Sequence, residues 1–538
     1  MLESVFKIGQ KMFNFYVFYF VVMVLLCVEA FVAHVYAWDL DHEMYYGARL
    51  LHGELVWTSE FHDKLPFVPF LFIIPAYFKS IDVFQIISMG LIFSTSIFMK
   101  NIFEKLYQNY KISNSIYYFC TALYPFLLCF SYNSFATINC IGVSFYVLSF
   151  LLLIKENFLV DEKKVIQIST LLLGSMLAAM AISIRPYYLP SYGVILILSV
   201  LLSQENKTIK NYLWMFGKIS MWVMAIAVWG FFLNAFPYVV TGQFASFLDG
   251  LAMLASPINP ISGPESFFMF ARKTPDLFFW GSWSLMGILV VSGLVVDKRN
   301  FSRLEIKIFS ISFLSGVALL FFIISQHYWE HYIQLFMGNF CICVMAFLVW
   351  QSECKLPAML YARYGDIVGK KILPISLVSL LIIPPVDMIK RDIKNKNKDY
   401  YDIKVAQATR KDWKAEFFAE YVNKNYRSKR PDFLFPEDIK AHWILDEPRH
   451  HFLHAANTRH VFFGWWEKLK FRSSHFYVVS NGEQYCQLIK ENGPTLIAVT
   501  PSEYLTPCLS EASSGYVQDA ELKQGKKVLL VFKRAGSP

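Results

Sequence analysis

The stretch from Trp38 to Pro69 reads WDLDHEMYYGARLLHGELVWTSEFHDKLPFVP and directly follows the first long apolar run of the chain. It carries these charged side chains: Asp39, Asp41, Glu43, Glu54, Glu60 and Asp63 against Arg49 and Lys64. Charged groups this close to a bilayer are costly unless they are paired, solvated or used in function. The stretch is therefore a candidate functional loop, and the alternative is a solvated loop, because runs of charge are usually solvated.

The composition indicates a membrane protein. Of the 538 residues, 55% are hydrophobic and 17% aromatic, whereas an ordinary soluble domain is roughly 45–50% apolar. The formal net charge of +9 comes largely from Lys and Arg in short loops between apolar runs. Positive-inside topology explains these cations better than nucleic-acid binding, so we expect no nucleic-acid partner.

Apolar runs predict a polytopic α-helical protein with about 11 spans. The first runs from Phe13 to Trp38, too long for a cleavable signal peptide, with its N-terminus in the cytoplasm. The others are predicted at 83–99, 115–131, 136–154, 167–184, 187–203, 212–235, 277–296, 308–325, 332–350 and 372–388. PFVPFLFIIPAYF (66–78) is short for a span and contains prolines, which predicts a juxtamembrane or re-entrant helix.

Loop charges agree with this count as far as the tenth span. The short loops predicted outside carry almost no cations apart from Arg185, Arg272 and Lys273. The last span breaks the pattern, because eleven crossings place these cations outside: Lys390, Arg391, Lys394, Lys396 and Lys398. Late charges weigh less once earlier helices have fixed the orientation, so we expect the tail outside. One span more or fewer would reverse its side.

The domains expected are a membrane domain (1–388) with its first extracytoplasmic loop at 38–82, a linker (389–400) and a soluble α/β domain (401–538). Within the tail, TLIAVT (495–500) and KVLLVFKR (527–534) predict buried strands, and KAEFFAEYVNKNY (414–426) predicts a helix. Cys486 and Cys508 lie in this tail. They could pair if the tail is extracytoplasmic.

The first extracytoplasmic loop contains a spaced pattern of residues that resembles a known family. The pattern consists of Asp41, Glu43, Tyr45, Ala48, Leu51, Gly53, Asp63, Lys64 and Pro66. It resembles that of C-type (GT-C) membrane glycosyltransferases, in particular the bacterial protein O-mannosyltransferase-like and aminoarabinose (lipid A) transferase-like families. Ile184-Arg185-Pro186 and HYWEHYIQLF (327–336) fit more loosely. The resemblance implies a GT-C-like bacterial inner-membrane protein with a C-terminal extracytoplasmic α/β domain.

The resemblance also implies that a sugar moves from a polyprenyl-phosphate donor to an envelope acceptor: lipopolysaccharide, lipid A, another glycan or a protein. The site would lie among the first loop, the 236–277 loop and the outer ends of the spans. Asp41 is the expected general base, with Asp39 in reserve, and Glu43 orients the acceptor or Arg49. The alternative role for Asp41 is an N-cap on the helix that begins HEMYYGARLL.

Positive charge is needed for the phosphate leaving group. Arg185 is the first candidate, because a guanidinium offers a forked donor to phosphate oxygens, and its alternative is snorkelling at the interface. The further candidates are Arg272, Lys273, His331 and Tyr332. Lys64 could bind phosphate or pair with Asp63, and the alternative for His327 and His331 is a hydrogen-bonded interfacial role.

We expect no metal to be required, although a divalent cation is possible. FATINCIGVSF (135–145) offers Asn139 where these families often carry a second acidic residue, and an amide is a poor ligand for a hard cation. Asp249 or Glu265 could substitute for that residue. In the tail, His450 and His454 have helical spacing for zinc, but these lie near Pro448 and lack a clear acidic ligand set.

Two other classes of protein compete with a transferase. A lipid or small-molecule transporter or flippase would show charged residues deep within several spans and paired broken helices in two related halves. The ionisable groups of this chain instead gather at the predicted outer boundary. A non-catalytic assembly or sensor protein would have no cavity beside Asp41.

Overall fold

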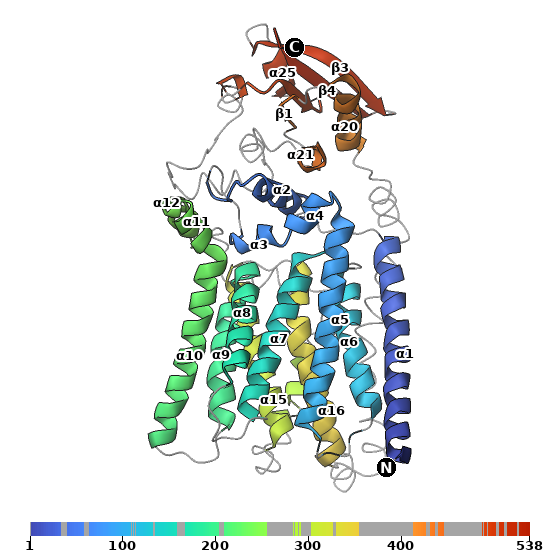
Figure 1. The fold of residues 1–538 in the computed structure, drawn as a ribbon, viewed down its shortest axis with the longest axis vertical. Helices are drawn as coiled ribbons and strands as arrows, with labels where there is room; N and C mark the ends of the chain where they lie inside the picture. Colours follow the sequence, from blue (N-terminus) through green and yellow to red (C-terminus); the bar gives the residue numbers. More distant parts are fainter. Residues whose placement is uncertain are drawn as a thin grey trace. The chain divides into compact units, whose positions relative to one another are not determined.

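The computed structural model describes residues 2–33, 40–58, 64–108, 110, 112, 114–132, 135–158, 167–203, 209–255, 283–284, 286–288, 290–291, 303–326, 330–354, 413–426, 431–435, 440–445, 487, 489–491, 493–501, 505–510, 514–524 and 527–537. The chain divides into two compact units (Figure 1). The bundle unit comprises 1–36, 85–231 and 261–403. The loop-and-tail unit comprises 37–84, 232–260 and 404–538.

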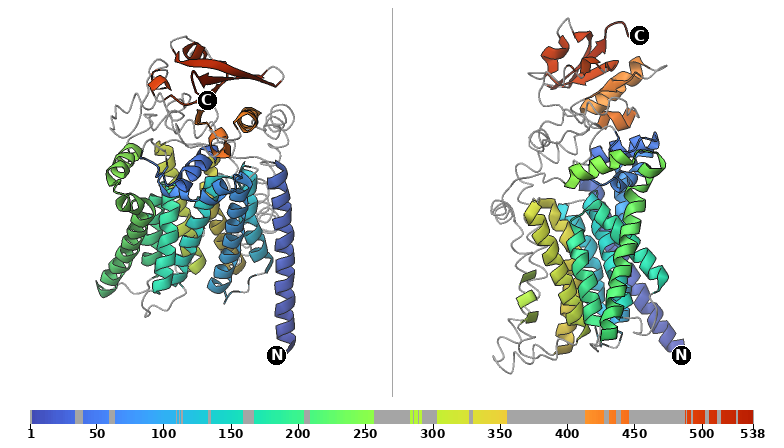
Figure 2. Two further views of the ribbon diagram at one scale, coloured as in Figure 1. Left: turned by 45° about the horizontal axis from the view of Figure 1, so that its top comes forward. Right: turned by 90° about the vertical axis from the view of Figure 1, so that its left-hand side faces the viewer.

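The bundle unit consists of long helices that run side by side (Figures 1 and 2). They are α1 (Leu2–Ala33), α5 (Ile81–Leu106), α6 (Asn114–Tyr132), α7 (Ile138–Phe158), α8 (Ile168–Ile184), α9 (Tyr188–Ser203), α10 (Ile209–Asn234), α15 (Leu304–Gln326) and α16 (Met337–Cys354). A 3-10 helix, η2 (Glu330–Phe336), precedes α16. The first residues of α5 and the last of α10 belong to the loop-and-tail unit.

The predicted spans match apolar helices wherever the structure describes enough of the segment. Among the described residues, five helices are long and apolar enough to cross a membrane and four apolar helices are shorter, so nine of the predicted segments fall on apolar helices. Of the other two, 277–296 is described only in fragments and 372–388 lies outside the described residues. The helices indicate a multi-pass membrane protein, and the number of crossings stays a prediction.

Two helices form the centre of the bundle unit. In α7 and α16, 83% and 94% of the apolar window is buried, compared with 11% in α10. Tyr146 Oη of α7 lies 2.7 Å from Ser191 Oγ of α9, and the Asn339 amide of α16 donates to Ser315 Oγ of α15 at 2.7 Å. Such polar contacts satisfy side chains that lipid cannot solvate and join α7, α9, α15 and α16.

The tail folds around a four-stranded sheet of order β1-β2-β4-β3. The strands are β1 (Phe433–Leu434), β2 (Leu496–Val499), β3 (Tyr516–Gln524) and β4 (Lys527–Arg534). β1 pairs parallel with β2, and the other pairs are antiparallel. The described helices beside it are α20 (Trp413–Asn425), α21 (Lys440–Leu445) and α25 (Leu505–Ser510).

The segments 414–426, 495–500 and 527–534 therefore have the predicted secondary structure. Continuous apolar runs in the strands and helical spacing in α20 place their apolar side chains in one core, where Phe418 of α20 packs against Phe433 of β1 at a ring distance of 5.1 Å. The boundary at residue 401 and the extracytoplasmic location of this part stay predictions.

The first loop forms three short helices in the loop-and-tail unit: α2 (Leu40–Leu51), α3 (Phe67–Phe70) and α4 (Ile73–Tyr77). Helix α2 lies between α3 and α4 on one side and α21 on the other (Figures 1 and 2). The single juxtamembrane or re-entrant helix predicted over 66–78 is thus two helices. Prolines 69 and 75 lack the N–H that a continuous helix uses, which favours the break.

Gly47 allows α2 to approach the turn between α3 and α4. A Cβ atom at this position would lie 2.6 Å from the backbone oxygen of Phe72. Backbone atoms cannot rotate away as a flexible side chain can, so a larger residue has to push the helices apart. The absence of a side chain at Gly47 thus sets the distance between α2 and the short helices.

We predict that Gly47→Ala lowers the stability of the protein by about 1–3 kcal/mol, because overpacking outweighs the better helix propensity of alanine. The measurement is the thermal unfolding midpoint of purified protein in detergent. Gly90→Ala in α5 is the matched control, since nothing lies within 4 Å of its Cβ position. Equal midpoints for the two variants would contradict the close approach.

Candidate functional site

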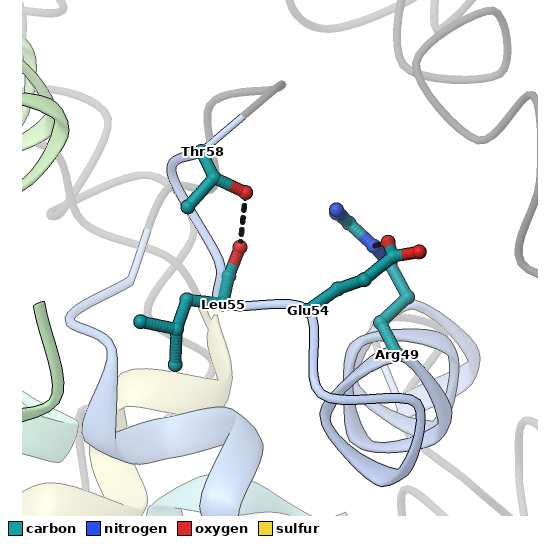
Figure 3. A network of polar contacts seen from close by, with 4 residues as sticks. All are labelled: Arg49, Glu54, Leu55 and Thr58. Atoms are coloured by element: carbon teal, nitrogen blue, oxygen red, sulfur yellow. Dashed lines mark hydrogen bonds and ion pairs between the residues drawn. The ribbon is translucent and has the colours of Figure 1, made fainter. Parts of the chain in front are cut away.

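The C-terminal end of α2 closes in a turn that the sequence encodes locally. Gly53 has φ +79, the left-handed conformation that glycine adopts without strain. The Gly53 N–H donates to the Leu50 carbonyl and the Glu54 N–H to the Arg49 carbonyl, which is the Schellman pattern. The Arg49 Nε then donates to Glu54 Oε2 at 3.0 Å (Figure 3), so this turn is fixed by both backbone and side chain.

The N-terminal end of α2 is fixed by an ion pair. Lys64 Nζ lies 2.9 Å from Glu43 Oε1, and the two side chains are 7% and 0% exposed. A buried pair of this kind is strongly sensitive to loss of one partner, because the other charge stays buried. The pair therefore ties the residues just before α3 to the first turn of α2.

Asp41 lies in the first turn of α2, next to this ion pair in the chain, and is partly buried. Asp41 does not occupy the N-cap position considered as its alternative role, because the helix already includes Leu40. Acidic side chains in a first turn interact favourably with the positive end of the helix dipole. Asp41 is thus a carboxylate on a rigid helix rather than on a loop.

The first loop contacts the 232–260 segment, which overlaps the 236–277 loop expected at the same site, but sequence reasoning did not identify the residues in contact. This segment forms α11 (Phe236–Val240) and α12 (Phe244–Ala255). Trp57 is fully buried with φ +64, and a Cβ at Gly250 would collide with its indole ring. The one available signal was a glycine within an apolar helical stretch.

A tyrosine makes the second link between these segments. The hydroxyl of Tyr238 donates to the Val56 carbonyl. Burial raises the pKa of Tyr238, and the positive charge of Arg49 opposes this shift in part. The phenol therefore keeps its proton at neutral pH and remains a donor, so the segment Val56–Trp57 is held from two sides.

In the bundle unit, Arg185 lies between α8 and α9, where the helix ends in extended backbone. Its Nε donates to Asn139 Oδ1 at 2.7 Å, and its guanidinium lies over the Tyr332 ring at 5.4 Å. Both partners are buried and neutral. These contacts orient the cation without cancelling its charge, whereas a carboxylate at position 139 would cancel it.

Gln334 positions the segment that carries Tyr332, and no sequence pattern singled it out. It is fully buried; its Oε1 accepts from Thr137 Oγ1 at 2.9 Å, and its amide donates to the Leu128 carbonyl at 3.4 Å. These bonds connect η2 to the residues before α7 and to α6. Asn139 and Tyr332 are therefore presented to Arg185 by connected elements.

The structure brings together some of the predicted site residues. Glu43 meets Lys64, and Arg185 meets Tyr332 and Asn139. The following candidates lie outside the described residues: Asp39, Asp63, Glu265, Arg272, Lys273, His327, His450, His454 and Cys486. For His331 the structure describes the backbone but not the side chain.

No group of three or more His, Cys, Asp or Glu side chains that could hold a metal occurs among the described residues. Asp249, offered above as a substitute ligand, lies in α12 and belongs to no such group there. Cys508 is disulfide-bonded, and its predicted partner, Cys486, lies in a part of the chain that is not described.

The buried ion pair yields a stability prediction. Glu43→Gln removes the carboxylate from the buried Lys64 ammonium, and we expect it to cost about 3–5 kcal/mol. The double variant Glu43→Leu/Lys64→Met should regain most of this loss, because it removes both charges. Denaturant unfolding in detergent, followed by tryptophan fluorescence, measures both.

Glu521→Gln is the control, because its pair with Lys523 in β3 is 40% and 60% exposed and should contribute at most about 1 kcal/mol. If Glu43→Gln were as mild as this control, the pair would have no part in holding the first loop.

Comparison with known proteins gives little further identification. No protein-family model matches the sequence, and no curated protein matches it. Among solved structures, the chain is similar to the crystal structure of the Archaeoglobus fulgidus oligosaccharyltransferase in the apo form, with a TM-score of 0.42 and 11% sequence identity. The match covers 90% of this chain and 69% of that chain. A TM-score of this size does not establish a shared fold.

Proposed function

We propose that the protein is a membrane glycosyltransferase of the C type, which moves a sugar from a polyprenyl-phosphate donor to an acceptor of the cell envelope. The observation that carries the proposal is the first loop: an acidic helix, α2, held by a buried ion pair at one end and a closed turn at the other. A catalytic carboxylate needs a fixed position relative to its substrate. The sequence pattern of the first loop, which resembles that of C-type glycosyltransferases, also supports the proposed function.

Asp41 acts as the general base. Its carboxylate takes the proton of the acceptor hydroxyl, and the acceptor oxygen forms a bond to the anomeric carbon of the sugar. The bond between that carbon and the phosphate oxygen breaks, and polyprenyl phosphate leaves with the electron pair. Asp39 stays the reserve candidate for the base.

Arg185 binds the phosphate of the donor. A guanidinium recognises phosphate oxygens with forked hydrogen bonds, and negative charge that develops on the leaving group is stabilised by a positive group already in place. The neutral contacts to Asn139 and Tyr332 support this role. Arg272, Lys273 and His331 remain further candidates for phosphate binding.

Lys64 and Glu43 are better explained as positioning residues. Lys64 was a candidate for the donor phosphate, but its ammonium is buried against the Glu43 carboxylate. A charge neutralised in this way adds little attraction for a second anion. Glu43 in turn fixes Lys64, and we assign both side chains to holding α2 in place.

We place the reaction on the outer face of a bacterial inner membrane. The disulfide at Cys508 supports an extracytoplasmic tail, because disulfides persist in oxidising compartments. The acceptor classes are lipopolysaccharide or lipid A, another glycan, or a protein. The proposed reaction uses the side chains of Asp41 and Arg185. A divalent cation could assist at the donor phosphate.

We predict that Asp41→Asn lowers sugar transfer by about 10²–10⁴-fold, the usual contribution of a general base, while its thermal unfolding midpoint stays near that of wild type. Asp39→Asn should retain activity. The assay follows labelled sugar from polyprenyl phosphate to envelope acceptors in membranes with matched protein levels. Full activity of Asp41→Asn would show that this residue is not the general base. Absence of transfer by the wild-type protein would contradict the proposal that the protein is a transferase.

A second prediction concerns the charge of Arg185. Asn139→Asp places a carboxylate on the Arg185 Nε and should raise the KM for the donor by about tenfold, roughly 1.4 kcal/mol of lost phosphate binding. Asn139→Gln keeps a neutral acceptor and should be milder. Glu104→Gln, which alters an ion pair of α5, is the control. An unchanged KM in Asn139→Asp would separate Arg185 from donor binding.

A further inference from the structure

Helix α11 begins where a candidate membrane span ends. The span in α10 runs from Leu213 to Asn234, and α11 starts at Phe236. Only 11% of the α10 window is buried, so most of its side chains face lipid if it crosses the membrane. The chain therefore enters α11 at the edge of the hydrocarbon layer.

The exposed face of α11 and α12 is apolar. The following side chains, which we call the apolar stripe, are between 39% and 69% exposed: Phe236, Val239, Val240, Phe244, Leu248 and Leu251. Residues 244, 248 and 251 follow helical spacing along one face of α12. The ring of Phe232, in the last turn of α10, lies 5.3 Å from that of Phe236, so the apolar surface continues from the span.

The opposite face of these helices is already used. Phe247 and Gly250 pack against Trp57, and Tyr238 binds the Val56 carbonyl. The helices therefore have one face on the first loop and the other open. Exposed apolar surface of this extent is unfavourable in water and marks an interaction site.

We propose that α11 and α12 lie in the membrane interface, with the apolar stripe inserted among the acyl chains of the leaflet next to the end of α10. Lipid is the occupant because the stripe continues directly from a lipid-facing span. Residues 236–255 contain no Lys or Arg, so insertion depends on acyl-chain contact and not on anionic headgroups. The helices thereby anchor the segment Val56–Trp57 of the first loop at a fixed depth.

The test uses the full-length protein in phosphatidylcholine nanodiscs with a photoreactive benzoylphenylalanine at one position. Leu248 and Val240 are the test positions, and Val517 in β3 is the matched control, because it is also apolar and 55% exposed. Mass spectrometry then counts lipid adducts. We expect at least about tenfold more adduct at Leu248 and Val240 than at Val517, with no change when part of the lipid is phosphatidylglycerol.

The thermal unfolding midpoint of each labelled protein checks that it is folded. Two test positions are used so that the experiment remains decisive if one variant misfolds. Equal lipid adducts at Leu248, Val240 and Val517 would overturn the proposal. So would crosslinks from Leu248 to a protein in native membranes in place of lipid. Because the readout is not sugar transfer, its outcome is independent of the proposed enzymatic activity.

Discussion

The ion pair between Glu43 and Lys64 is the constraint on which the first loop depends. The chain leaves α2 at Leu51, passes through the closed turn at Gly53, and returns at Lys64 to the first turn of the same helix. Two buried charges are favourable only in good geometry, so the pair specifies one closure of the loop. That closure brings α3 and α4 to α2, where Gly47 permits their close contact.

Two cations of this protein are held in opposite ways. Lys64 is buried against a carboxylate, whereas two of the partners of Arg185 are a neutral amide oxygen and an aromatic face. A carboxylate partner neutralises a cation and an amide does not. This difference is the basis for proposing a structural role for Lys64 and a phosphate-binding role for Arg185. It also gives Asn139 a physical role: the amide preserves a charge that an aspartate would reduce.

Local patterns predicted the elements of this fold well. Apolar runs identified the candidate spans that the structure describes, and the 495–500 and 527–534 segments form strands because a short, continuous apolar run is readable within a few residues. Contacts between distant segments were not readable. The contact of Lys64 with Glu43 was not foreseen, and Asp63, its expected partner, lies outside the described residues. The contacts of Trp57 with Gly250 and of Arg185 with Asn139 depend on tertiary packing that no local pattern records.

Local patterns also could not predict that three separate segments form the compact loop-and-tail unit. Segments 37–84 and 232–260 are each too short to enclose a core of their own. They are stabilised by contacts across the unit: α2 packs on α21, Lys79 Nζ donates to the Ile444 carbonyl at 2.9 Å, and Asn234 Oδ1 accepts from the Phe67 N–H. All three links join segments that lie far apart in the sequence within this one unit, so no single segment determines the position of α2.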